Sequence, residues 1–132
     1  MKLLERIHTV FGTPPLAAHI AVGKKGEWIA MKHLRHCNYR IIDHNVRVGK
    51  HDEIDIVAWD PTDKVYVFAE VKTRSRADVD FRPELNVTYQ KKLRMARAAR
   101  RWMVQRNEDV GYRLDVLCIV ENSVANHFID VH

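Results

Sequence analysis

Three segments rich in β-branched and aromatic residues follow one another with only short turns between them. They are YRIIDHNVRV (39–48), EIDIVAWD (53–60) and KVYVFAEVKT (64–73). Segments of this composition predict strands, and turns this short favour antiparallel neighbours. The sequence therefore predicts a three-stranded antiparallel meander, around which the rest of the chain has to be arranged.

Helical patterns lie on both sides of this meander. Apolar residues recur every three or four positions from Leu16 to about Cys37. Pro83 can start a second helix that runs to about Arg106. A fourth strand (113–120) and a short fifth (126–132) follow, and a long helical crossover permits the fourth to lie parallel to its neighbour. The predicted fold class is α/β, with the core order αβββαβ and a mixed central sheet flanked by helices.

The chain of 132 residues has the size of one domain and contains no repeat or Gly/Ser-rich linker. We expect an N-terminal arm at 1–15 and a single domain at 16–132. No apolar run approaches the roughly 20 residues of a membrane-spanning helix, so no membrane partner is expected. The two cysteines, Cys37 and Cys118, are far apart, which favours a reducing cytoplasm as the location.

Positive charge is concentrated in one segment. Residues 83–106 carry seven basic side chains and one acidic one, whereas the whole chain has a net charge of +5. A basic block on an otherwise nearly neutral body is typical of a surface that binds a polyanion such as nucleic acid. Arg94, Arg97 and Arg101 are spaced to share one side of the second helix. The alternative is a solvated helix face without a partner.

Charged residues also occur within the predicted strands. Glu70 and Lys72 are two positions apart, so both point to the same face of the sheet. If the turn at 61–63 pairs the second and third strands, Asp55 directly faces Glu70. Opposed carboxylates are unfavourable unless a cation or a proton lies between them. Two carboxylates and a lysine suit a Mg²⁺ site for phosphodiester chemistry.

Glu27 is a third unusual acid, because it lies in the middle of the apolar stripe of the first helix. Its position is either at the end of the core or toward a site. For single residues the simpler interpretations are a Glu70–Lys72 salt bridge and an edge position for Glu27. The four charged residues taken together favour a site.

Asp55 followed by Glu70-Val71-Lys72 resembles the D…ExK signature of the PD-(D/E)xK nuclease superfamily, which has the restriction-endonuclease-like fold. From about Gly23 onward the chain more closely resembles the YraN-like family of small uncharacterised bacterial proteins (uncharacterised protein family 0102). Members of this family are similar to archaeal Holliday junction resolvases in fold and site. The segments that carry the resemblance are GKKGEWIAMKHL (23–34), YRIIDHNVR (39–47), DEIDIVA (52–58), FAEVKTR (68–74), the spacing of residues 87–102 and RLDV (113–116).

The resemblance implies a Mg²⁺- or Mn²⁺-dependent endonuclease that acts on DNA, including branched DNA. Asp55, Glu70 and the Val71 carbonyl match the metal ligands, and Lys72 matches the lysine that orients or activates the attacking water. Glu27 matches the helical catalytic glutamate of the resolvase-like branch. The residues expected to contact nucleic acid are Arg47, Arg74, Lys91, Arg94, Arg97 and Arg101.

One departure from the family pattern concerns the turn before Asp55. Where the family usually has Gly-Glu-Ile-Asp, this chain has Asp52-Glu53-Ile54-Asp55, so the backbone freedom of a glycine is lost there. The alternative function is a non-catalytic nucleic-acid-binding protein with a nuclease-like fold. The intact acidic pair argues against it, because a pure binder has no use for opposed carboxylates. The expected partners are DNA and, in a homodimer, a second copy of the chain.

Overall fold

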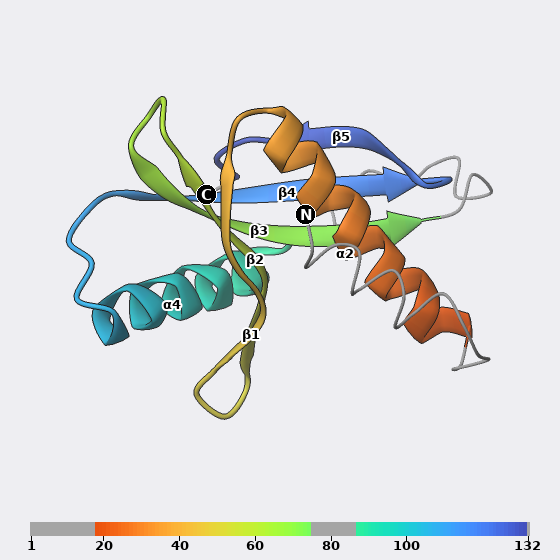
Figure 1. The fold of residues 1–132 in the computed structure, drawn as a ribbon. Coiled ribbons are helices and arrows are strands. Elements are labelled where there is room, and N and C mark those ends of the chain that lie inside the picture. Colours follow the sequence, from red (N-terminus) through yellow and green to blue (C-terminus); the bar gives the residue numbers. More distant parts are fainter. Residues whose placement is uncertain (1–17, 75–86, 132) are drawn as a thin grey trace.

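A computed structural model of the chain describes residues 18–74 and 87–131. The expected N-terminal arm at 1–15 lies outside the described residues. In chain order the elements are α2 (Ala18–His36), β1 (Arg40–Val48), β2 (Asp52–Asp60), β3 (Val65–Arg74), α4 (Tyr89–Gln105), β4 (Tyr112–Val120) and β5 (Ser123–Phe128) (Figure 1).

The strands form one five-stranded sheet in the order β1-β2-β3-β4-β5. The neighbours are antiparallel except for β3 and β4, which are parallel and are connected through α4. The antiparallel meander, the helical crossover and the mixed sheet confirm the predicted fold class. Both edges are irregular, because the register shifts between Ile41 and Asp43 on β1 and between Cys118 and Ile119 where β5 pairs with β4.

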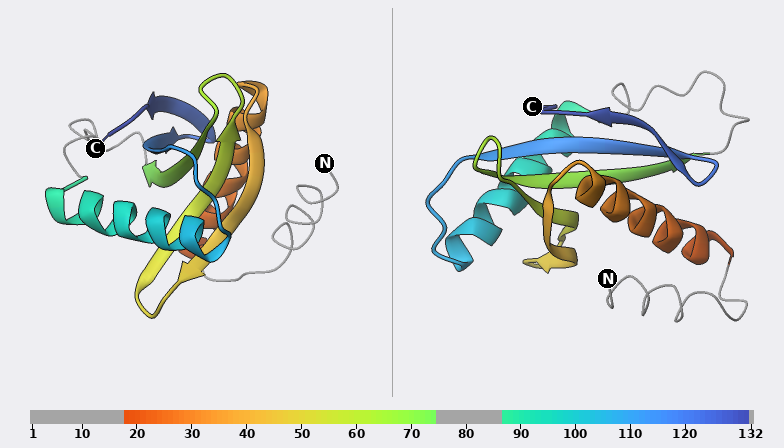
Figure 2. Two further views of the ribbon diagram at one scale, coloured as in Figure 1. Left: turned by 90° about the vertical axis from the view of Figure 1, so that its left-hand side faces the viewer. Right: turned by 45° about the horizontal axis from the view of Figure 1, so that its top comes forward.

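The two helices cover opposite faces of this sheet (Figure 2). On one face, Trp102 and its buried neighbours on α4 pack against Val57 and Phe68. On the other face, Met31 and Leu34 of α2 belong to the cluster built on the opposite side chains of the same strands. The sheet is therefore the middle layer of three, with an apolar core on each side. None of the described helices has the length and apolar character needed to span a bilayer.

A buried ionic network joins β4 to the β2–β3 turn and to β5. The Arg113 guanidinium donates hydrogen bonds to Asp115 (2.9 Å), Asp60 (3.1 Å) and Asp63 (3.0 Å). Asp115 is also hydrogen-bonded to His127 Nε2 at 2.8 Å. Burial alone would raise the pKa of Asp115, but the hydrogen bonds from His127 and Arg113 hold it below its usual value. The RLDV segment thus has a structural role, because its two charged residues compensate each other inside the fold.

Two predicted boundaries were wrong. Helix α4 begins at Tyr89 instead of Pro83, because Thr88 has an extended backbone and its hydroxyl accepts a hydrogen bond from the Lys91 N–H at 3.1 Å. The fifth strand begins at Ser123, three residues before the predicted start at 126. It follows a two-residue turn in which Glu121 and Asn122 both have positive φ (48° and 65°), so the hairpin closes immediately after β4.

Gly26 lies where α2 passes close to Thr73 of β3, and this contact leads to a test of the packing. A Cβ built at Gly26 would collide with the Thr73 Oγ1 atom. We expect Gly26→Ala to lower the free energy of unfolding by about 1–3 kcal/mol. In a solvent-exposed helix the same change would instead raise it by about 1 kcal/mol, because alanine has the higher helix propensity. Thermal or denaturant unfolding measures the difference. Thr73→Ala in the same chain removes the colliding hydroxyl and should restore stability; a Gly26→Ala protein as stable as wild type would show that the layers are not this close.

Candidate active site

The acidic pair lies where the pairing of β2 with β3 ends. The registered pairs run from Asp60↔Val65 to Ile56↔Ala69, which is the register that the position of the turn predicted. Asp55 and Glu70 occupy the next positions, beyond the last pair. There the Asp55 Oδ2 atom accepts a hydrogen bond from the Val71 backbone N–H at 2.8 Å. The carboxylate thus provides the acceptor for a main-chain donor that faces β2 but lies beyond the ladder.

Burial gives Asp55 unusual acid–base properties. The pKa of its carboxyl is raised from 3.8 to about 7, first by burial and then by the negative charge of Glu70. The Glu27 charge raises it further, while the Val71 hydrogen bond and the Lys91 charge oppose the rise. Without a cation, Asp55 is therefore only partly ionised near neutral pH.

Two lysines from different elements meet at Glu70. Its side chain is 12% exposed, and its Oε1 atom lies 3.3 Å from the Nζ of Lys72 and 3.2 Å from the Nζ of Lys91. Lys72 comes from β3 itself, whereas Lys91 comes from the first turn of α4. Two cations on one carboxylate place positive charge beside the acidic pair, which is an arrangement that can hold a phosphate group.

Glu27 of α2 approaches the same place from the other side. It is half-buried, and burial raises its pKa, whereas the charges of Lys24 and His44 and a hydrogen bond with the Asn45 side chain lower it in part. The Glu70 charge raises the pKa of Glu27, and the Glu27 charge raises that of Asp55, so the three carboxylates are close enough to affect one another.

The sequence reasoning missed the partner of Glu27. Asn45 lies in the middle of β1 but has a φ of 51°, in the left-handed region that asparagine tolerates better than most residues. Its side chain hydrogen-bonds to Glu27. An asparagine inside a β-branched segment is the signal that could have indicated a local departure from regular strand geometry.

The donor atoms at this place fit a hard divalent cation. Among the described residues no group of three or more histidine, cysteine, aspartate or glutamate side chains has the arrangement of a metal cluster. Mg²⁺ and Mn²⁺, however, bind through few protein oxygens and keep several waters. Asp55 and Glu70 provide two carboxylates, and a cation would compensate the burial and the repulsion from Glu70 that raise the pKa of Asp55. The Val71 carbonyl adds a third oxygen, because the C=O and N–H of one strand residue face the same edge.

The basic residues predicted to contact nucleic acid do not all lie together. Lys91 lies at the acidic pair, where it forms an ion pair with Glu70. Arg74 is the last residue of β3 and donates a hydrogen bond to the Thr73 carbonyl at 2.9 Å. Arg47 lies on the exposed hairpin of β1 and β2, paired with Glu53 at 2.9 Å. The three α4 arginines are exposed and act together on one carboxylate, Asp52, whose pKa they lower: Arg94, Arg97 and Arg101.

Asp52 accounts for the departure from the family pattern. It is buried at the start of β2 and accepts two hydrogen bonds from the Arg97 guanidinium, at 2.9 and 2.8 Å. Positive φ is supplied earlier in the turn by Gly49, at 67°. The turn therefore keeps a glycine where its backbone requires one, and the aspartate fastens the hairpin of β1 and β2 to α4.

The order αβββαβ, with acids at the point where β2 and β3 separate, defines an α/β protein with a restriction-endonuclease-like core. The model of the uncharacterised protein family UPF0102 matches residues 26–119, and the chain belongs to this family. The match includes Glu27, Asp55, Glu70 and Lys72. The resemblance found in the sequence is thereby confirmed at the level of the family.

The relatives of the chain are UPF0102 proteins of bacteria. The one from Geobacter sulfurreducens is 41% identical over 99 residues, which is 74% of each chain. One from Desulforamulus reducens is 35% identical over 104 residues, covering 77% of this chain and 83% of the relative. One from a Mycobacterium species is 38% identical over 98 residues, covering 74% and 71%. The match thus extends over most of both chains.

The raised pKa of Asp55 predicts how stability depends on pH in the metal-free protein. Its folded value of about 7 exceeds the ordinary 3.8, so the wild type loses stability as the pH rises from about 4 through about 7. An asparagine at this position cannot ionise, and its carbonyl can still accept the Val71 hydrogen bond. We expect the free energy of unfolding of Asp55→Asn to exceed that of the wild type by on the order of 1–3 kcal/mol near pH 8, against a ceiling of about 4 kcal/mol, and by about a third of that near pH 5.

Denaturant unfolding in the presence of a chelator, at both pH values, measures this difference. Asp109→Asn, at an exposed position, is the matched control and should show no such dependence. An Asp55→Asn difference that is the same at both pH values would contradict the assignment of the raised pKa to this carboxyl.

Proposed function

We propose that the protein is a Mg²⁺- or Mn²⁺-dependent endonuclease that hydrolyses phosphodiester bonds in DNA, branched DNA included. The observation that carries the proposal is the acidic pair, Asp55 and Glu70, enclosed at the end of the β2–β3 ladder with Lys72 and Lys91 on Glu70. Half-buried carboxylates that repel each other destabilise a fold unless they bind something. A cation and a phosphate group are what this combination of charges suits.

Asp55, Glu70 and the Val71 carbonyl would hold the cation, which neutralises phosphate charge and lowers the pKa of the attacking water when it is bound. The ammonium of Lys72 stabilises negative charge that develops on the phosphate in the transition state. Its ion pair with Glu70 holds this ammonium in place. Lys91 adds a second positive charge from a different element, so the phosphate is contacted from β3 and from α4.

Glu27 supplies a third carboxylate on the side of α2. Because burial raises its pKa, it binds a proton more readily than an exposed glutamate does. This property suits a group that accepts a proton from the attacking water or orients that water. The Asn45 side chain lies beside this carboxylate and opposes part of the rise in its pKa.

The second candidate function is binding of nucleic acid without cleavage. The exposed arginines of α4 favour it, since phosphate binding needs only positive charge. The acidic pair argues against this second function, because negative charge next to a phosphate-binding surface opposes the binding of phosphate. For either function we propose action in the cytoplasm, where the free cysteines Cys37 and Cys118 stay reduced. Assembly into a homodimer stays a prediction.

Thermal melts with Mg²⁺, Mn²⁺ and Ca²⁺, together with cleavage assays, test the proposal. The cation binds only the folded chain, so it should raise the melting temperature of the wild type; at a hundredfold excess over Kd the gain is about 2.7 kcal/mol. Asp55→Asn and Glu70→Gln should abolish both this response and the cutting of DNA. The substrates are duplex, single-stranded, flap and four-way-junction DNA. If Mn²⁺ neither stabilises the wild type nor supports cutting of any of these, the binding function replaces the nuclease.

Glu27→Gln separates a catalytic role from a structural one. Glutamine keeps the shape of the side chain and can still hydrogen-bond to Asn45, so the free energy of unfolding should change little. Cleavage should fall by about 10²-fold or more, since the variant cannot accept a proton. Glu53→Gln, on the exposed side of β2, is the control and should cut as fast as the wild type. Full activity of Glu27→Gln would remove this residue from the mechanism.

A further inference from the structure

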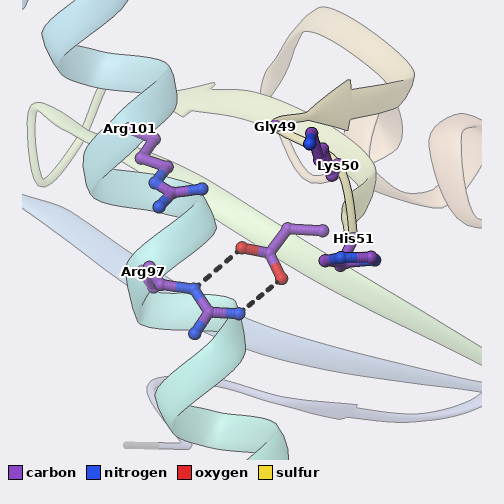
Figure 3. Close-up of a pocket in the computed structure, with 6 residues that line it drawn as sticks. Gly49, Lys50, His51, Arg97 and Arg101 are labelled. Carbon is purple, nitrogen blue, oxygen red and sulfur yellow. Dashed lines mark hydrogen bonds and ion pairs between the residues drawn. The ribbon is translucent and has the colours of Figure 1, made fainter.

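A pocket of about 440 Å³ lies between the turn that joins β1 to β2 and the exposed side of α4 (Figure 3). It lies apart from the acidic pair. A second hollow of about 470 Å³ continues it along the helix. The first pocket is lined by Gly49, Lys50, His51, Asp52, Arg97 and Arg101. The second shares Gly49, Arg97 and Arg101 and adds Arg100, Val104 and Gln105.

Positive charge in this pocket exceeds negative charge. The one carboxylate in its wall, Asp52, is buried and engaged by both hydrogen bonds from Arg97 (Figure 3). Among the residues that the structure describes, Lys50 and Arg101 form no ion pair with a carboxylate. Both side chains are exposed, one on each wall. Two cations are thus available to an anion that enters the pocket.

The glycine of the turn allows the two walls to approach. Gly49 has a φ of 67°, a conformation that favours glycine, and a Cβ there would lie 2.7 Å from the Nη1 atom of Arg101, so the guanidinium would have to shift. Arg97, held by Asp52, fixes the distance between the hairpin and α4. The pocket is therefore a consequence of how the hairpin and α4 are fastened together by Arg97 and Asp52.

We propose that this pocket binds a phosphate group of the DNA backbone through Lys50 and Arg101, with Arg97 and Asp52 as the positioning residues. The inference rests on the proposed function only in taking DNA as the partner; it does not require cleavage. A continuous strand suits the site better than a small anion does, because the pocket runs on into the second hollow beside Arg100. Sequence reasoning had included Arg101 but not Lys50.

The distance between this pocket and the acidic pair sets the length of DNA that can reach both. Lys91 and Arg101 are ten positions apart on α4, about 15 Å along the helix axis. Asp52 and Asp55 are three positions apart on β2, about 10 Å. These lengths correspond to roughly three to four base pairs of duplex. A strand that occupies both places therefore extends at least about this length beyond the cut.

The test compares two double variants in binding to a short duplex DNA, in chelator so that no cation takes part. Lys50→Gln/Arg101→Gln removes the proposed contacts. Lys32→Gln/Arg40→Gln removes the same charges at exposed positions elsewhere. The dissociation constant is measured over a series of salt concentrations. We expect the first variant to reduce the slope of log K against log salt by about 1.8, two phosphate contacts at about 0.9 each, and the second to leave the slope unchanged.

An equal loss of slope in both variants would overturn the proposal, because net charge alone would then explain binding. Failure of the wild type to bind duplex DNA would overturn it as well. Stabilisation of the wild type by inorganic phosphate in a thermal melt, without any binding of DNA, would identify a small-anion site instead. A protein that binds through Lys50 and Arg101 but cuts no DNA would sustain this inference while the nuclease proposal fails.

Discussion

The hydrogen bond from the Val71 N–H to the Asp55 carboxylate is the interaction on which the site depends. A strand that stays paired on one side and loses its partner on the other leaves main-chain donors without acceptors, and such donors are costly inside a protein. Asp55 solves this problem with a side chain. The same solution buries a negative charge next to Glu70, so the backbone geometry and the unusual electrostatics have one cause.

Helix α4 joins parts of the molecule that the chain keeps far apart. Its buried side supplies the apolar core on one face of the sheet, its first turn brings Lys91 to Glu70, and its exposed side fastens Asp52 through Arg97. A shift of this helix would therefore disturb packing, the acidic pair and the basic pocket together. This coupling explains why the basic block in the sequence cannot be interpreted as a uniform charged surface.

Local patterns in the sequence were sufficient to predict what depends on neighbouring residues. The position of the β2–β3 turn fixed the register that brings Asp55 to the level of Glu70, since a hairpin leaves little choice in pairing. The pairing of Arg97 with Asp52, 45 positions earlier, has no such local signal. The start of α4 was missed because a proline suits the first turn of a helix but does not require one, whereas the cap at Thr88 decides the boundary. The left-handed conformation of Asn45 was missed because strand propensity is judged over a run of residues and does not indicate a single residue with a different backbone conformation.

The irregularities at the two outer strands of the sheet limit how it can associate. The outer strands of an open sheet expose rows of unpaired N–H and C=O groups, which can pair with another chain and lead to aggregation. On β1 the register shift between Ile41 and Asp43 and the left-handed Asn45 interrupt this row. On the opposite side β5 is only six residues long, and its pairing with β4 is itself shifted. Neither edge offers a long regular template, which disfavours growth of the sheet by strand addition.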